Sequence, residues 1–172
     1  MDAKLLIVGL APGLHGANRT GRPFTGDYAG DLLYATLLKL GLAKGTYDKR
    51  IDDGLELAGC RIVNSVRCVP PQNKPLPVEI TTCNQFLKVA IENHRAAKAL
   101  LALGAIAHDA TLKALGEKKS AHKFGHGARH RLKDGRTLID SYHCSRYNTN
   151  TGVLTPEMFE NAVGAAKQAA GL

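Results

Sequence analysis

Side chains that could do chemistry gather in three segments of the sequence. Residues 9–30 form a loop rich in glycine and proline that carries Phe24 and Asp27, while Asn64 and His143 each stand at the end of an apolar run. A carboxamide offers a donor beside an acceptor, and a neutral imidazole can donate a hydrogen bond. Three of these residues also have a structural interpretation: Asp27 stands where aspartate commonly caps a helix, Asn64 could satisfy local backbone, and His143 could cap its strand.

The loop at residues 9–30 orders few side chains into a core. Glycine allows the backbone to approach a ligand closely, and loops of this kind often carry function. The loop lacks the lysine–serine end of a phosphate-binding P-loop and the spacing of a dinucleotide fingerprint, which disfavours a hydrolase of free nucleotides.

Alternating strands and helices must position these residues. The apolar runs predict strands over residues 4–10, 60–68, 97–104 and 136–143, and helical spacing predicts helices over 27–42, 78–94, 107–116 and 155–172. This alternation predicts a three-layer α/β/α sandwich with a central, mostly parallel, four-stranded sheet. Ligands of such sheets bind beyond the carboxyl ends of the strands, where the three segments would meet. We expect a single domain over residues 1–172, with an irregular basic segment at 118–135.

The charge balance narrows the class of partner. The chain of 172 residues has 23 lysines and arginines against 15 acidic residues, a net charge of +8. The excess fits either a solvated basic surface or an electrostatic footprint for a polyanion, most simply nucleic acid. No run reaches the roughly 18 to 20 apolar residues of a membrane span, and the first residues lack a signal-peptide layout, so we expect a prokaryotic cytoplasmic protein without a membrane partner. Four cysteines then favour thiols or metal ligands over disulfides.

Three long segments resemble the family 5 uracil-DNA glycosylases of the uracil-DNA glycosylase superfamily. They cover residues 9–27, 64–83 and 126–158, with 101–112 between them in collinear order. The resemblance implies a DNA glycosylase of base excision repair that flips out uracil, together with other deaminated bases such as hypoxanthine, and hydrolyses its N-glycosidic bond. We expect it to be monofunctional, because no lysine stands at an obvious nucleophilic position in these motifs. The alternative is a catalytically impaired protein of the same fold that binds damaged DNA. We expect a monomer associated with the nucleoid.

The resemblance also implies roles for individual residues. Asp27 would handle the water, His143 would face the leaving pyrimidine oxygen and Asn64 would recognise the base edge. His126 matches the family pattern without an evident role. Phe24 would stack on the base, unless it is a core aromatic. The base pocket would be formed by Gly9, Leu10, Ala11, Pro12, Gly13 and Phe24, and DNA would be contacted by Arg19, Arg22, Ser145, Arg146, Tyr147 and Asn148.

The resemblance implies a 4Fe-4S cluster held by four cysteine thiolates. Cys68 and Cys83 match two of these metal ligands, and the family places the other two upstream of the first strand. That strand follows Met1 almost directly here, so the two missing ligands would lie upstream of Met1, on an N-terminal cysteine-bearing segment that this sequence lacks. Three explanations stay open: a shortened chain or a start placed too late, a natural variant without the cluster, or a partial cluster with substitute ligands. The sequence does not assign Cys60 and Cys144 as such substitutes.

Overall fold

The computed structural model describes residues 3–172 and contains a central sheet of five strands in the order β4-β1-β5-β7-β6. Strands β4, β1, β5 and β7 run parallel to one another, and β6 is antiparallel to β7. The predicted α/β class and the parallel four-stranded core are confirmed. The prediction of an irregular segment at 118–135 missed a fifth strand, because β6 is short and polar. The strands are β1 (Leu5–Gly9), β4 (Cys60–Asn64), β5 (Ala99–Leu103), β6 (Arg129–Arg131) and β7 (Thr137–Ser141).

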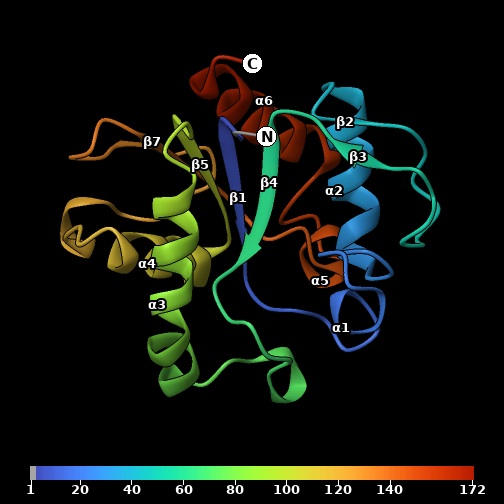
Figure 1. The fold of residues 1–172 in the computed structure, drawn as a ribbon, viewed down its shortest axis with the longest axis horizontal. Helices are drawn as coiled ribbons and strands as arrows, with labels where there is room; N and C mark the ends of the chain where they lie inside the picture. The colour runs from blue at the N-terminus through green and yellow to red at the C-terminus, as the bar shows by residue number, and fades with distance from the viewer. Residues whose placement is uncertain (1–2) are drawn as a thin grey trace.

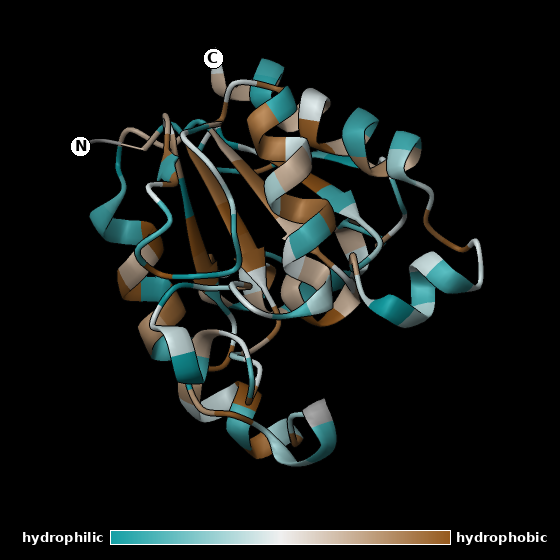
Figure 2. Cartoon of the chain, turned by 90° about the vertical axis from the view of Figure 1, so that its right-hand side faces the viewer, coloured by the Kyte–Doolittle hydropathy of each residue, from teal (hydrophilic) through white to brown (hydrophobic). Residues whose placement is uncertain are grey.

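The central strands are apolar on both faces. All five residues of β1 and of β5 are buried, as expected for parallel strands that are covered on both sides. Leu5 and Ile7 point into one hydrophobic cluster, while Leu6 and Val8 point into another. The sheet therefore separates two cores, and Figure 2 shows its hydrophobic strands enclosed by helices.

Two pairs of helices cover the two faces of the sheet (Figure 1). Helices α2 (Tyr28–Lys39) and α6 (Pro156–Ala170) supply Leu33 and Phe159 to the cluster that contains Leu5. Helices α3 (Pro77–Asn93) and α4 (Ala105–Ala114) supply Leu87 and Leu112 to the cluster that contains Leu6. No helix within residues 3–172 has the length and apolar character needed to cross a membrane.

Local sequence signals set the helix boundaries. Helix α6 starts with Thr155, whose hydroxyl accepts a hydrogen bond from the Met158 amide at 3.2 Å, followed by a proline that suits the first turn. Gly171 then ends this helix in the left-handed conformation that glycine adopts readily. At the start of α3, the Glu79 carboxylate accepts a hydrogen bond from the Leu76 amide at 2.6 Å.

Several short elements were not predicted. Figure 1 shows two of them, α1 and α5, at the end of the molecule toward which the arrow of β4 points. The short elements are α1 (Ala17–Thr20), α5 (Arg146–Asn150), the two-stranded ribbon of β2 (Ala43–Lys44) and β3 (Glu56–Leu57), and the 3-10 turns η1 (Pro71–Asn73) and η2 (Lys119–Ala121).

The pairing of β1 with β4 places Gly9 opposite Asn64. Cys60 and Ile62, which precede Asn64 at alternate positions, belong to the cluster that also contains Phe24. Because side chains alternate along a strand, Asn64 projects from this same face of the sheet.

Candidate active site

A cavity of about 380 Å³ opens beyond the carboxyl ends of β1 and β7, within the size range of small-molecule sites. Most of its lining comes from residues that the sequence predicts for the site; Ala29 and Pro70 are the additions. The lining residues are Leu10, Ala11, Pro12, Gly13, Phe24, Asp27, Ala29, Pro70, His143, Ser145 and Arg146.

Phe24 forms a wall of this cavity. Its side chain is 7% exposed and belongs to the hydrophobic core, so the ring is both a core aromatic and a cavity lining. Its backbone adopts a φ of 61°, a left-handed conformation that costs a non-glycine residue about 1 to 2 kcal/mol. A β-carbon at Gly9 would lie 2.7 Å from Phe24 Cζ and 2.5 Å from Asn64 Oδ1. Only glycine at position 9 therefore allows the ring and the carboxamide to approach the strand this closely.

Asn64 Oδ1 is a buried acceptor without a hydrogen-bond partner in the described part of the chain. Leaving such an atom unpaired is costly unless a ligand satisfies it. Asn64 does not line the cavity beside His143. It lines a second cavity of about 540 Å³, and Pro12 lines both.

His143 carries the second unpaired buried atom of the site, Nδ1, which also has no partner among residues 3–172. The imidazole ring lies 6.2 Å from the Phe24 ring, measured between centroids. Burial lowers the pKa of His143, which favours the neutral imidazole. The position of the backbone at this residue is held by Asn148 Nδ2, which donates to the His143 carbonyl at 2.9 Å. This contact gives Asn148 a structural role beside its predicted DNA contact.

His126 also supports this end of β7. Its Nδ1 accepts a hydrogen bond from the Tyr142 amide at 3.1 Å, so its Nε2 must be the nitrogen that donates to the Met158 carbonyl at 3.2 Å. The ring therefore joins the residue before His143 to helix α6, which gives the histidine a role that the sequence did not reveal.

Asp27 occupies the N-cap position of α2, but its side chain makes no capping hydrogen bond. The carboxylate instead lies against the turn that follows β1: a β-carbon at Gly13 or Gly16 would overlap its oxygen atoms. Burial raises the pKa of Asp27, and the nearby His15 partly opposes this shift. A more basic carboxylate at the cavity wall is suited to accept a proton from water.

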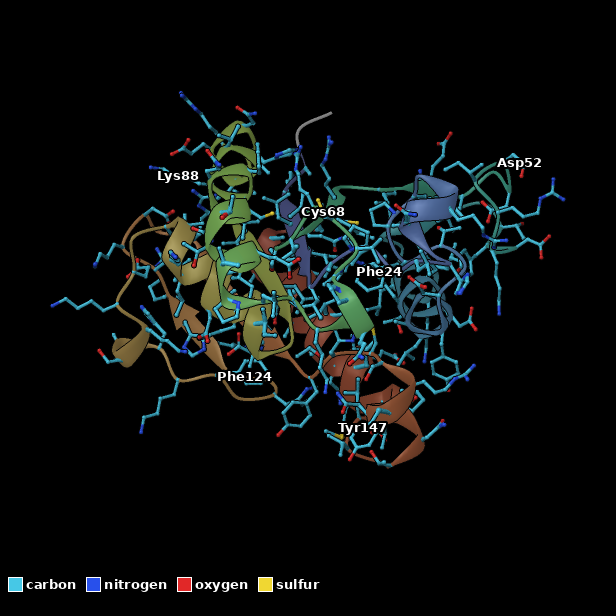
Figure 3. The ribbon with its side chains drawn as sticks, turned by 90° about the horizontal axis from the view of Figure 1, so that it is seen from below. Phe24, Asp52, Cys68, Lys88, Phe124 and Tyr147 are labelled. Atoms are coloured by element: carbon cyan, nitrogen blue, oxygen red, sulfur yellow. The ribbon has the colours of Figure 1, made fainter. Side chains whose placement is uncertain are left out.

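Some of the predicted DNA contacts are exposed, and others already bind within the protein. Arg19, Arg146 and Tyr147 are exposed, and Figure 3, which looks onto the strand ends, shows Tyr147 on the outlying α5 segment. Ser145 begins α5, where its hydroxyl accepts a hydrogen bond from the Asn148 amide at 3.3 Å.

Arg22 differs from the others because its donors are already engaged. It makes a two-pronged salt bridge with Asp53 at 2.8 and 2.7 Å, and its Nε donates to Thr25 Oγ1 at 2.6 Å. Arg22 thus holds the loop that carries Phe24. Its predicted phosphate contact stays a prediction, and no feature of the sequence pointed to its partner 31 residues away.

The four cysteines do not form a four-thiolate site by themselves. Cys68 is exposed and Cys83 is half-buried, whereas Cys60 and Cys144 are buried, and burial raises their pKa values to about 11 and about 12. Within residues 3–172, no cysteine belongs to a cluster of three or more groups that could bind a metal. The substitute ligands considered above thus do not fit a 4Fe-4S cluster.

The resemblance also implied two cluster ligands that are absent from this sequence. The two further ligands were expected upstream of Met1, and Met1 itself lies outside the described residues. The origin of the missing cysteine pair therefore stays a prediction, and Cys68 and Cys83 are the two family-matched thiols that the structure places.

A histidine–aspartate network lies on the α4 side of the sheet and was missed by sequence reasoning. His108 Nδ1 lies 2.7 Å from Asp140 Oδ1, and His130 Nε2 lies 2.9 Å from Asp140 Oδ2. His108 Nε2 also lies 3.0 Å from the carbonyl of His122. Carboxylate and carbonyl oxygens only accept, so both nitrogens of His108 must donate and the ring must be a cation. The available signal was an aspartate within the apolar strand TLIDS.

This network is the one potential metal cluster in the described residues, and the distances between its atoms are those of hydrogen bonds. Its polar atoms satisfy one another. We therefore interpret it as a structural ion pair.

Comparisons with known proteins agree on one family. A protein-family model described as "Uracil DNA glycosylase superfamily" matches residues 1–167. Three similar proteins carry the name Type-5 uracil-DNA glycosylase. The one from Thermus thermophilus is 47% identical over 99% of this chain and 78% of its own length. The one from Mycobacterium tuberculosis is 42% identical over 98% and 64%, and the one from Pyrobaculum aerophilum is 39% identical over 99% and 74%.

Proposed function

The chain belongs to the uracil-DNA glycosylase superfamily, and on this basis we propose that it hydrolyses the N-glycosidic bond between uracil and deoxyribose in DNA. The observation that carries this proposal is the pair of unpaired buried polar atoms, Asn64 Oδ1 and His143 Nδ1, beside the ring of Phe24. A flipped nucleobase offers an aromatic face to the ring and polar edges to such atoms.

Base recognition follows from the chemistry of these groups. Asn64 Oδ1 can accept a hydrogen bond from the N3–H of uracil, which satisfies an acceptor that is otherwise unpaired. Stacking on Phe24 contributes roughly 1 to 3 kcal/mol per base in nucleic-acid sites. Residues 10–13 line the pocket and would form its floor, where Ala11 presents no polar side chain.

The bond breaks with the electron pair moving to the base, so negative charge develops on the uracil and positive charge on the sugar. A neutral His143 can donate a hydrogen bond to the pyrimidine oxygen as that charge grows. The water oxygen bonds to C1′ of the sugar, and the ionised Asp27 carboxylate can accept the proton that the water loses. This division assigns stabilisation of the leaving group to His143 and activation of water to Asp27.

The same pocket supports a wider substrate range. An apolar floor imposes few hydrogen-bond requirements on the base edge, so we extend the proposal to deaminated purines such as hypoxanthine. Arg19, Arg146 and Tyr147 are the exposed residues that we propose to contact the DNA backbone or the opposite strand. Cys68 and Cys83 are carried forward as two ligands of the cluster that the resemblance implies, and the cluster enters no step above.

A labelled duplex with one uracil, incubated with the protein and then treated with alkali, tests this function. We expect strand scission at the uracil, and Asp27→Asn should slow it by at least about 100-fold, the usual contribution of a general base. DNA binding without scission would instead favour the alternative of a damaged-DNA-binding protein. Scission by Asp27→Asn at the wild-type rate would remove Asp27 from the mechanism.

A control variant separates chemistry from folding. Lys88→Gln changes an exposed charge on α3, whose ammonium lies 3.9 Å from the Glu92 carboxylate. It should leave scission unchanged, and both variants should retain the thermal unfolding midpoint of the wild type within a few degrees.

A further inference from the structure

Tyr28 links the start of α2 to the short helix α5. It directly follows Asp27 and is 40% exposed. The guanidinium carbon of Arg146 lies 5.0 Å from the centroid of the Tyr28 ring. The Tyr28 hydroxyl accepts a 3.3 Å hydrogen bond from Thr149 Oγ1. Both partners belong to α5, so the Tyr28 side chain makes two contacts with this helix.

Arg146 has little else to hold it. Across residues 3–172, its side chain makes no hydrogen bond within the protein and no salt bridge, although it lines the cavity beside His143. A free arginine side chain loses up to about 2 kcal/mol of rotamer entropy when it is ordered. Stacking on Tyr28 orders the guanidinium before a ligand arrives and leaves its N–H edges free. An arginine held this way is prepared to bind a phosphate with two hydrogen bonds.

We propose that Tyr28 is a positioning residue that fixes Arg146 at the mouth of the base cavity, so that the guanidinium meets a DNA phosphate beside the flipped nucleotide. This inference rests on the proposed function. It adds a residue outside the set that the sequence predicted, and it explains why an aromatic side chain with a hydroxyl stands half-exposed next to Asp27.

A double-mutant cycle on DNA binding tests the link between the two side chains. The probe is a fluorescent duplex with one uracil, bound by the Asp27→Asn protein so that the substrate persists. Tyr28→Leu should weaken binding about two- to fivefold, the range of an exposed cation–π contact. In protein that also carries Arg146→Gln, Tyr28→Leu should have no further effect, because the group that it positions is gone.

Two further measurements distinguish positioning from a loss of packing. Arg146→Gln should lower the slope of log affinity against log salt by about one, as expected for one phosphate contact, and Tyr28→Leu should lower it in part. Tyr28→Phe keeps the ring and should retain most of the affinity. Val89→Ala is the control, because it shortens an exposed apolar side chain of α3 that lines neither cavity, and it should leave affinity within about twofold.

The outcomes separate this inference from the proposed function. Equal weakening by Tyr28→Leu with and without Arg146, at unchanged thermal stability, would overturn the positioning role. Wild-type protein that binds the duplex but never excises uracil would overturn the proposed function, while the cycle would still report on Tyr28. A wild type that does not bind DNA would overturn both.

Discussion

The Asp27 carboxylate lies where two glycines leave room for it. A β-carbon at Gly16, or one at Gly13, would overlap both oxygens of the carboxylate. The turn after β1 therefore sets the position of the residue to which we assign water activation. Its glycines act by their lack of side chains, because a β-carbon at either position would occupy the space of the carboxylate.

Substitution of Gly16 by alanine should displace Asp27 and slow excision. A misplacement of about 1 Å can cost around 100-fold in rate, so we expect Gly16→Ala to lower single-turnover excision by at least about tenfold. The control is Gly164→Ala in α6, where the new β-carbon would meet no described atom within 4 Å apart from its chain neighbours and the adjacent backbone of its own helix. It should leave excision unchanged and stabilise the protein by up to about 1 kcal/mol. A Gly16→Ala enzyme with wild-type rate would show that the carboxylate position is not limiting.

Much of the candidate site could be predicted at the level of residues. The segments that resemble the family predicted that Asp27, His143 and the loop at 10–13 would share one cavity, since the ends of parallel strands meet at one edge of the sheet. The partners of Arg22 and Tyr28 could not be predicted. Both depend on contacts between segments more than 30 residues apart, and sequence spacing does not encode such contacts.

At the level of elements, the pair of Arg22 and Asp53 joins the loop that carries Phe24 to the segment between β2 and β3. The two side chains are 13% and 2% exposed. Asp53 also accepts hydrogen bonds from the amides of Asp48 and Leu55 at 2.9 and 3.1 Å, and the contact with Arg22 holds the pKa of its carboxyl well below its usual range.

Neutralising Asp53 should loosen both segments. We expect Asp53→Asn to lower the free energy of unfolding by about 1.5 to 3 kcal/mol, the value of hydrogen bonds to a charged group, as measured by denaturant titration. Glu160→Gln, which breaks the exposed pair with Lys39, should cost no more than about 1 kcal/mol. Equal losses in the two variants would contradict a structural role for the buried pair.

The sequence predicted elements with apolar runs or clear boundary signals better than short polar ones. Strands such as β1 and β5 are continuous apolar runs, and helices such as α6 carry clear start and stop signals. Among the elements that were missed, β6 and α5 are polar and span three and five residues. Short polar elements have no measurable periodicity, and their conformation depends on tertiary contacts such as the pairing of β6 with β7.

At the level of the whole molecule, two histidines on opposite sides of the sheet respond differently to pH. Burial disfavours the charged form of His108, but its contacts with Asp140 and the His122 carbonyl outweigh burial and raise its pKa. Burial lowers the pKa of His143. The His108 cation therefore stabilises the fold below the unfolded pKa of about 6.5, and this contribution is lost as pH rises through the higher folded pKa. The neutral form of His143 is compatible with the fold above the unfolded pKa of about 6.5. Stability is lost as pH falls from about 6.5 through the lower folded pKa, because the buried ring must then become charged.

Stability attributable to these histidines should therefore be greatest near a pH of about 6.5. We expect the decline of the unfolding free energy above that pH to become shallower in His108→Gln, and the decline below it to become shallower in His143→Gln, measured by denaturant titrations from about pH 5 to 9. Because Asp140 also contacts His130, and His122 and Asp109 lie nearby, Asp140→Asn is the second test. It should abolish the alkaline decline that His108 produces. An unchanged alkaline slope in both variants would refute the assignment of a buried cation.

The register between β1 and β4, which pairs Gly9 with Asn64, determines the face of the sheet from which the carboxamide projects. Alternate residues of β4 face opposite layers, so one residue gained or lost within this strand would exchange its two faces. The same asparagine would then project from the other face of the sheet. A gained residue would place Val63 beside Phe24, and a lost residue would place Ser65 there. The proposed base recognition therefore depends on the register of an edge strand, in which one inserted or deleted residue would change the side chain beside Phe24.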